Sequence, residues 1–319
     1  MYVPDIYITI SRPGTSTYVP IDFVHVCEIE KSWATLTDTC KITLPRKLKL
    51  DDKMIQNYIK SGDEVTIVGG YDGRLSTEFT GYVTKIEATT PIVIHCEDEM
   101  WKLKQRNFSK VYKQVSLSGL ISELAPNYIK SITDMQLGDI VIENASPAKV
   151  FDMLKQKFGI ATFFKNNALY SGLQAPYPAN PIKHVYRLQD NVIDNNLTFR
   201  RAEEVRLKVK AISTKPDGKK IEVELGDFDG EQRTLNYYNL PEKELKQVAT
   251  AEIERLKKDG YSGTLTTFFE PWATHGNVAI IQDADYPEKD GEYFIDKVVV
   301  SMGVDGYRRN ISLGKRAGV

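Results

Sequence analysis

The sequence predicts a mainly β protein in which a small α+β subdomain separates two similar β modules. Short segments that alternate between polar and apolar residues, bounded by Gly, Asp and Pro, fill both ends of the chain. A pattern of three such segments occurs twice, at residues 62–96 and at 276–313, in the same order and with similar spacing. Helical periodicity is concentrated between them. A duplicated β module suits a ring-like assembly better than it suits a pocket.

Composition argues against several classes of protein. The 319 residues are enough for two or three domains, and the 41% hydrophobic content is typical of a folded chain. The 42 basic and 43 acidic residues give a net charge of −1, which argues against specific nucleic-acid binding. No apolar run reaches the roughly 20 residues that span a bilayer, and no secretory leader is evident. We therefore expect assembly in the cytoplasm, without membrane insertion.

Residues 1–105 form the first expected module. Its strands are expected at 5–10, 23–30, 39–44, 62–68, 79–86 and 91–96. The run Gly69-Gly70-Tyr71-Asp72-Gly73 separates two of these strands as a hairpin loop. Asp98 then caps a short helix at 99–105, whose acidic residues come first and basic residues last, as the helix dipole favours. Short strands with regular turns are typical of a barrel or a sandwich.

Residues 106–185 form the α/β middle domain. One helix is expected at 117–124, and a second follows Ser146-Pro147, with Ser as N-cap and Pro in the first turn. Gly159 stands where a C-cap glycine belongs, and a small hairpin is expected at 160–170. The proline-rich run at 175–181 is typical of a linker.

Residues 186–319 form the second expected module. A hairpin is predicted from 205–212 and 221–225, joined by the turn Lys215-Pro216-Asp217-Gly218. One helix, at 241–258, is expected to interrupt the strands, with Asn239 as its cap. The final strands are those of the second copy of the repeated pattern.

The strongest catalytic candidate is the run His95-Cys96-Glu97-Asp98-Glu99. A Cys/His pair can supply a nucleophile and a base, and His with carboxylates can hold a metal. Adjacent strand residues point to opposite faces, however, so His95 and Cys96 cannot cooperate on one strand. An acidic helix start after a strand explains the run better. Cys27, Cys40 and Cys96 lack a Cys-x-x-Cys spacing and are expected to pack as small apolar residues.

Two other patterns are weaker. Asp283-Ala284-Asp285 and Asp227-Phe228-Asp229-Gly230 are similar to calcium loops but lack the distal Glu, and polar hairpin tips explain them better. Trp33, Trp101 and Trp272, with the 17 tyrosines, raise the possibility of a sugar-binding surface, but core or interface roles fit them better. We predict no catalytic, cofactor-binding or metal-binding residues, and no cofactor.

Three regions carry a resemblance to a known family: 62–83, 146–172 and 271–309. They resemble the baseplate hub of contractile phage tails, a group with the late-control D proteins, the Mu-like tail proteins, the T4-type hub and the hub part of type VI secretion spike proteins. The positions that resemble family positions are Gly81, Tyr82, Gly159, Gly276, Tyr293, Gly306 and Tyr307. The resemblance rests on scattered spacing along nearly the whole chain.

The resemblance implies two tail-tube-like β-barrels and a structural, non-enzymatic role in a phage, a prophage or a related contractile injection system. It implies a homotrimer that forms a pseudo-hexameric ring in the virion tail baseplate and joins the tail-tube protein to the spike protein. The tape-measure protein is a further candidate partner. Two alternatives stay open: a non-catalytic β-rich adhesin or carbohydrate-binding module, and a cell-wall hydrolase with paired acids.

Overall fold

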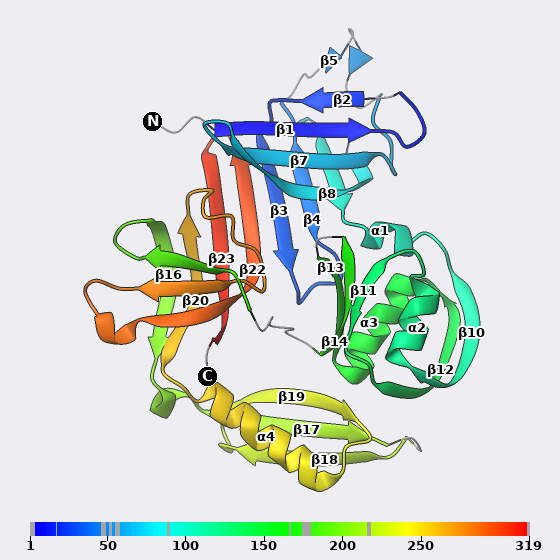
Figure 1. The fold of residues 1–319 in the computed structure, drawn as a ribbon, viewed down its shortest axis with the longest axis vertical. Coiled ribbons are helices and arrows are strands. Elements are labelled where there is room, and N and C mark those ends of the chain that lie inside the picture. The colour runs from blue at the N-terminus through cyan, green and yellow to red at the C-terminus, as the bar shows by residue number, and fades with distance from the viewer. Residues whose placement is uncertain are drawn as a thin grey trace.

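The structure is a computed structural model that describes residues 4–16, 18–45, 49–50, 53–54, 58–87, 90–165, 167–173, 180–215 and 218–317. The chain is mainly β with a small α/β part, which confirms the predicted fold class. Figure 1 shows a large curved sheet, a compact α/β unit beside it and a smaller helix-backed sheet at its foot. Within the described ranges, no helix has both the length and the apolar character needed to cross a bilayer.

Strands from both ends of the chain join in one sheet, which we call the shared sheet. Its strands are β1 (Pro4–Ser11), β2 (Tyr18–Ile21), β3 (Val26–Ser32), β4 (Thr39–Thr43), β7 (Glu64–Tyr71), β8 (Arg74–Glu87), β9 (Val93–Glu97), β15 (Lys183–Arg187), β16 (Val192–Arg200), β20 (Gly260–Thr267), β21 (Val278–Gln282), β22 (Gly291–Gly303) and β23 (Gly306–Arg316). The order is β16-β20-β23-β22-β3-β4-β9-β8-β7-β1-β2, with β21 on β22 and β15 on β21. The two modules meet where β22 pairs antiparallel with β3.

The repeated pattern corresponds to two antiparallel meanders, β7-β8-β9 and β21-β22-β23. In each meander the middle strand is long, with 14 residues in β8 and 13 in β22. The loop lengths differ between the copies. The tight turn comes first in one meander, at residues 72–73, and last in the other, at 304–305. The repeat is therefore one of strand order and not of loop length.

The middle unit packs three helices, the first of them a single turn, against two small sheets. Its elements are α1 (Met100–Leu103), β10 (Phe108–Ser116), α2 (Leu117–Leu124), β11 (Ile129–Ile132), β12 (Gln136–Ala145), α3 (Pro147–Phe158), β13 (Ile160–Lys165) and β14 (Ala168–Leu173). Ser146 caps α3 by accepting from the Lys149 amide at 3.3 Å, and Gly159 ends it in the left-handed conformation, as predicted. The proline-rich run lies largely outside the described residues.

The third unit comprises β17 (Leu207–Thr214), β18 (Lys220–Gly226), β19 (Glu231–Tyr238) and α4 (Glu242–Leu256). The predicted hairpin is present, but it lies outside the shared sheet, in a separate sheet of order β18-β17-β19. Its buried apolar residues pack on α4, while the opposite face carries pairs such as Lys210–Glu222. A sheet with one apolar face is stabilised by a helix that covers that face. The segment that interrupts the second module is therefore a complete unit of three strands and a helix, and not the single helix that was expected there.

Smaller differences concern helix starts and unpredicted elements. The helix after Asp98 covers only 100–103, although the Asp98 carboxylate still accepts from the Met100 amide at 2.9 Å. Asn239 has a positive φ and does not cap α4, whose N-cap is Pro241. Residues 216 and 217 of the predicted turn lie outside the described part of the chain. Other short elements are β5 (Lys49–Leu50), β6 (Lys53–Met54), η2 (Ala202–Glu204) and η3 (Pro287–Lys289).

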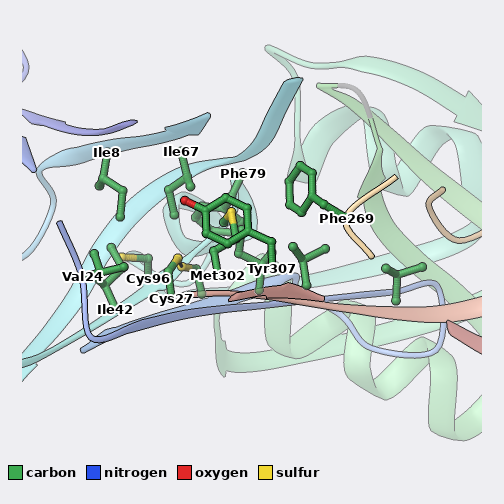
Figure 2. Close-up of a cluster of buried hydrophobic side chains, with 14 of the residues drawn as sticks. Ile8, Val24, Cys27, Ile42, Ile67, Phe79, Cys96, Phe269, Met302 and Tyr307 are labelled. Atoms are coloured by element: carbon green, nitrogen blue, oxygen red, sulfur yellow. Dashed lines mark hydrogen bonds between the residues drawn. The ribbon is translucent and has the colours of Figure 1, made fainter. Parts of the chain in front are cut away.

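One hydrophobic core serves both modules. Figure 2 shows Ile8 and Ile67, from the first module, gathered with Met302, Tyr307 and Phe269 from the second. Full burial of such side chains contributes about 1.5–3 kcal/mol each. The three cysteines are free and buried in this core, which confirms that they pack as small apolar residues. Neither module therefore has a complete core of its own.

Candidate functional site

A buried ion-pair cluster lies where the two modules meet. The Arg309 guanidinium on β23 donates to Glu78 on β8 at 2.8 Å, and Lys31 on β3 donates to the other oxygen of Glu78 at 3.2 Å. Arg309 also donates to the carbonyls of Phe269 at 2.9 Å and Ala273 at 2.8 Å. Arg309 is 1% exposed. One side chain thus ties strands of both modules to the 269–273 loop.

Glu78 reaches the core because β8 carries a β-bulge at this position. The register pairs Phe79 with Ile67 and Thr77 with Val68, so Glu78 is the extra residue. A bulge re-aims a side chain, and Glu78 and Phe79 are both buried although they are adjacent on a strand. Sequence reasoning missed Glu78, because the strand was expected only from residue 79, whereas β8 begins at Arg74. A charged residue directly beside a core aromatic was the available signal.

Two opposing effects set the ionisation of Glu78. Burial alone would raise the pKa of this carboxyl group, but the charges of Arg309 and Lys31 and their hydrogen bonds outweigh burial and lower the pKa. Glu78 is therefore held as a carboxylate between two cations. Removal of either cation leaves a poorly compensated charge in the core, which is strongly destabilising.

A pocket of about 300 Å³ separates the shared sheet from the middle unit. On one wall, the Asp98 carboxylate accepts from the Thr37 hydroxyl at 2.7 Å and from the Asp38 amide at 3.0 Å. Burial, and then the charge of Asp98, raises the pKa of Asp38 to about 8. Burial raises the pKa of Asp98 to about 6. The charge of Asp98 together with burial favours retention of a proton on Asp38.

The middle unit contributes the opposite wall. The Lys165 ammonium, at the end of β13, donates to the His275 carbonyl at 2.8 Å, and the His275 ring contacts Phe163 edge-on at 5.4 Å. Burial lowers the pKa of Lys165, and burial followed by the nearby cations lowers the pKa of His275 to about 3. The neutral His275 ring and the buried Lys165 ammonium therefore connect the middle unit to the loop before β21.

The structure separates the predicted catalytic candidates. Cys96 lies in the core, while His95 lies on the outer face with Nε2 3.3 Å from Glu87. Glu99 accepts hydrogen bonds from Tyr82 at 2.7 Å and Tyr128 at 3.0 Å. The segment 95–99 therefore joins strand β9 to the middle unit, and the expectation that His95 and Cys96 point to opposite faces is confirmed.

The calcium-like patterns have other partners. The Asp283 carboxylate accepts from the Tyr261 hydroxyl at 3.0 Å and from Gln189 at 2.8 Å. Asp227 accepts from the Leu207 amide at 2.9 Å and pairs with a lysine. Across the described ranges, no group of three or more metal-binding side chains is found. Both patterns brace turns in this structure.

The tryptophans differ in their surroundings. The Trp33 indole donates to Asp296 at 3.0 Å, and Trp101 stacks on Tyr82 with ring centroids 5.4 Å apart. Trp272 is 40% exposed. Two of the three therefore take part in contacts between elements, which favours structural roles over a sugar-binding surface.

The family-like positions of the first module and middle unit lie at tight contacts. A Cβ atom added to Gly81 would lie 2.1 Å from the Glu97 carbonyl oxygen, so β8 and β9 approach closely only with glycine there. Tyr82 follows it and stacks as described above. Gly159 has a φ of 69°, which a residue with a Cβ adopts at a cost.

The family-like positions of the second module support its core and turns. The Tyr293 hydroxyl accepts from the Tyr261 amide at 2.9 Å in the buried interior. The Tyr307 ring lies 5.7 Å from that of Tyr71, which connects the two modules. The remaining two have positive φ values, Gly276 in the loop before β21 and Gly306 at the first position of β23.

The shared sheet has open ends. Among the described strands, β16 pairs only with β20, and β2 pairs only with β1. An unpaired edge exposes backbone amides and carbonyls that can pair with another chain. A third described strand, β15, pairs only with β21, so the shared sheet is a branched strip with free edges at β2, β15 and β16 on one continuous core.

This fold, two meanders with an α/β unit between them, is similar to the folds of solved phage tail proteins. The expected resemblance to baseplate hub-like proteins is thereby confirmed at the level of the fold. No protein-family model matches the chain, and no curated protein matches its sequence.

Three solved structures illustrate this likeness. The tail protein from Neisseria meningitidis MC58 has a TM-score of 0.66 and 13% identity, with 98% of this chain and 97% of that chain covered. The 43 kDa tail protein of prophage MuSo2 from Shewanella oneidensis has a TM-score of 0.62 and 16% identity, with 98% of this chain and 97% of that chain covered. An E. coli component of the type VI secretion system, described as structurally similar to the T4 tail proteins gp27 and gp5, has a TM-score of 0.60 and 10% identity. The alignment covers 98% of this chain and 77% of that chain.

Proposed function

We propose that this chain is the structural baseplate hub of a contractile phage tail or a related injection machine. The observation that carries the proposal is the strip of two meanders on one core, with a free edge at each end. The likeness in fold to tail proteins supports it. In this proposal the segments 1–105 and 186–319 act as two tube-like modules, and 106–185 lies outside the ring.

Three copies would close such a strip into a ring. Each copy contributes two meanders, so a trimer presents six similar modules around its axis. Closure would cover the free edges of β2 and β16, which otherwise invite uncontrolled strand pairing. A closed ring with rotational symmetry is the ordinary outcome of such head-to-tail contacts.

The ring would join the hexameric tail-tube protein on one side to the trimeric spike protein on the other, with the tape-measure protein as a further partner. Its place would be the baseplate of the virion tail, after assembly in the bacterial cytoplasm. We infer a mechanical role and no catalysis. The buried titratable groups support this, because Glu78, Asp98 and Lys165 bind neighbouring residues and hold elements together.

The test is the oligomeric state of the purified chain. We expect mass photometry and sizing at micromolar concentration to give a particle of three times 36.2 kDa, and negative-stain images to show rings with six similar lobes. A monomer at these concentrations, or rings without sixfold-like modulation, contradicts the proposal. Saturable glycan binding by a monomer would instead favour the adhesin alternative.

A further inference from the structure

The third unit, from β17 to α4, has a hydrophobic core of its own. The buried members of this core all come from the unit itself and are Leu207, Val209, Ala211, Val223, Leu245 and Ala249. Among the described strands, β17, β18 and β19 pair only with one another. A segment with its own core can move as one body relative to the rest of its chain.

Two short segments connect this unit to the shared sheet. Residues 201–206 lead from β16 into β17, and residues 257–259 lead from α4 into β20. The Asp259 carboxylate accepts from the Ala202 amide at 2.7 Å, which joins the two segments. Arg316 on β23 donates to the Asp259 carbonyl at 2.8 Å and ties them to the shared sheet. Two short segments at one end of a unit can serve as its hinge.

One side chain at the far end of the unit reaches the middle unit. Tyr238 is the last residue of β19, which runs parallel to β17, so it lies at the end remote from the hinge. Figure 1 shows the tip of β19 beneath the middle unit. The Tyr238 ring meets the Phe158 ring edge-on, with centroids 5.8 Å apart. Of the described residues of the third unit, Tyr238 alone packs against the hydrophobic core of the middle unit.

A glycine of the middle unit makes room for the Tyr238 hydroxyl. Gly138 on β12 is buried and has a φ of 74°. A Cβ atom added there would lie 2.4 Å from the Tyr238 oxygen and 3.3 Å from Cζ of the same ring. Any larger residue at 138 would therefore displace Tyr238. Gly138 and Phe158 thus form a notch that the Tyr238 ring fills.

The remainder of the boundary between the two units is mostly polar. Its described polar residues are Gln114, Asp139, Gln156, Lys157, Lys215, Lys220 and Asn236. Units of one chain move relative to each other unless their interface is large and hydrophobic. A single aromatic contact among polar residues does not meet that condition.

We propose that the third unit is a hinged arm and that Tyr238 holds it closed against the middle unit. In the closed position Tyr238 fills the notch. In the open position the arm turns on segments 201–206 and 257–259, and the notch faces solvent. A partner that binds only the open arm would shift the population toward that position. The proposal does not depend on the trimer, because hinge and contact lie within one chain.

The experiment is single-molecule fluorescence energy transfer between dyes at Gln156→Cys in the middle unit and Lys220→Cys in the arm, which line the same boundary. The three native cysteines are buried and should not react with the dyes. With Tyr238 present, we expect one population of high transfer efficiency. Tyr238→Ala should raise the ratio of open to closed arms about tenfold or more, because aromatic burial and the ring pair are lost. Tyr238→Phe keeps the ring, so this matched control should stay closed.

Gly138→Ala tests the same contact from the middle unit. Its methyl group displaces the Tyr238 ring and should open the arm. Combining it with Tyr238→Phe removes the oxygen that lies 2.4 Å from that methyl group, and this double variant should close the arm again in part.

Three outcomes overturn the proposal. The first is an unchanged distribution of transfer efficiency in Tyr238→Ala, which would show that other contacts fix the unit. The second is an open arm in the protein that retains Tyr238. The third is loss of the circular dichroism signal in Tyr238→Ala, because an arm with its own core should stay folded when it opens. None of these outcomes bears on the proposed trimer.

Discussion

Substitution of Arg309 by methionine tests whether the two modules depend on the buried ion pair between them. The variant keeps much of the side-chain volume but removes the guanidinium that Glu78 accepts from at 2.8 Å. Two carbonyls, those of Phe269 and Ala273, lose their donors as well. Loss of one partner of a buried pair costs about 3–5 kcal/mol, and we expect the lower end because Lys31 still contacts Glu78 at 3.2 Å.

The assay is urea denaturation followed by tryptophan fluorescence. Lys297→Met is the matched control, because Lys297 pairs with Glu30 on the same sheet at 2.7 Å but both side chains are 37% exposed. That variant should cost about 0–1 kcal/mol. The double variant Glu78→Met with Arg309→Met should be less destabilised than the sum of the single variants, because no lone charge stays buried. An Arg309→Met variant as stable as Lys297→Met would refute the role assigned to this cluster.

Three further substitutions test other contacts. Gly81→Ala forces β8 away from β9, because the added methyl group would lie 2.1 Å from the Glu97 carbonyl oxygen. It should lower the free energy of unfolding by about 2 kcal/mol or more, measured by thermal denaturation. Asp38→Asn should flatten the pH dependence of stability. The native pKa of Asp38 is about 8, so between about pH 4 and pH 8 the native wild type holds a proton that the unfolded chain releases, and its free energy of unfolding falls by up to about 1.4 kcal/mol per pH unit. Tyr293→Phe removes the acceptor of the Tyr261 amide, should cost about 1–2 kcal/mol and should speed hydrogen exchange there.

Each of these substitutions has a control and an outcome that contradicts it. Gly119→Ala lies within α2, where the added methyl group meets the Ser116 hydroxyl at 3.3 Å and no backbone atom, and it should cost less than about 1 kcal/mol, so equal losses at Gly81 and Gly119 would argue against the close approach of β8 and β9. For Asp38, urea midpoints at pH 5, 7 and 9 that decline as steeply in Asp38→Asn as in the wild type contradict the raised pKa. Unchanged exchange at the Tyr261 amide in Tyr293→Phe contradicts the buried hydrogen bond.

Local features of the fold could be predicted because local physics determines them. Alternation of polar and apolar residues located most strands of the two meanders, and Ser146 and Gly159 marked the ends of α3. The opposite faces of His95 and Cys96 followed from the two-residue period of a strand. These signals depend only on residues close together in the sequence.

Pairing between distant strands could not be predicted in the same way. The period of β3 shows which residues alternate, but it does not identify β22 as its neighbour. The third unit was missed for the same reason, since the pattern of β17 suits either a barrel or a helix-backed sheet. The burial of Glu78 in the candidate site depends on a β-bulge in β8, and the residue types of a strand do not indicate where a bulge lies.

The pairing of β22 with β3 has a consequence for biosynthesis. The nascent chain makes β3 early, since it ends at residue 32, but its neighbour β22 begins only at residue 291, so that edge stays uncovered while all the residues between them are synthesised. Until then the N-terminal strands expose an apolar surface and an open backbone edge, both of which promote misassembly. Premature termination near the last strands should therefore yield insoluble fragments that proteases degrade, and not a shortened but functional subunit.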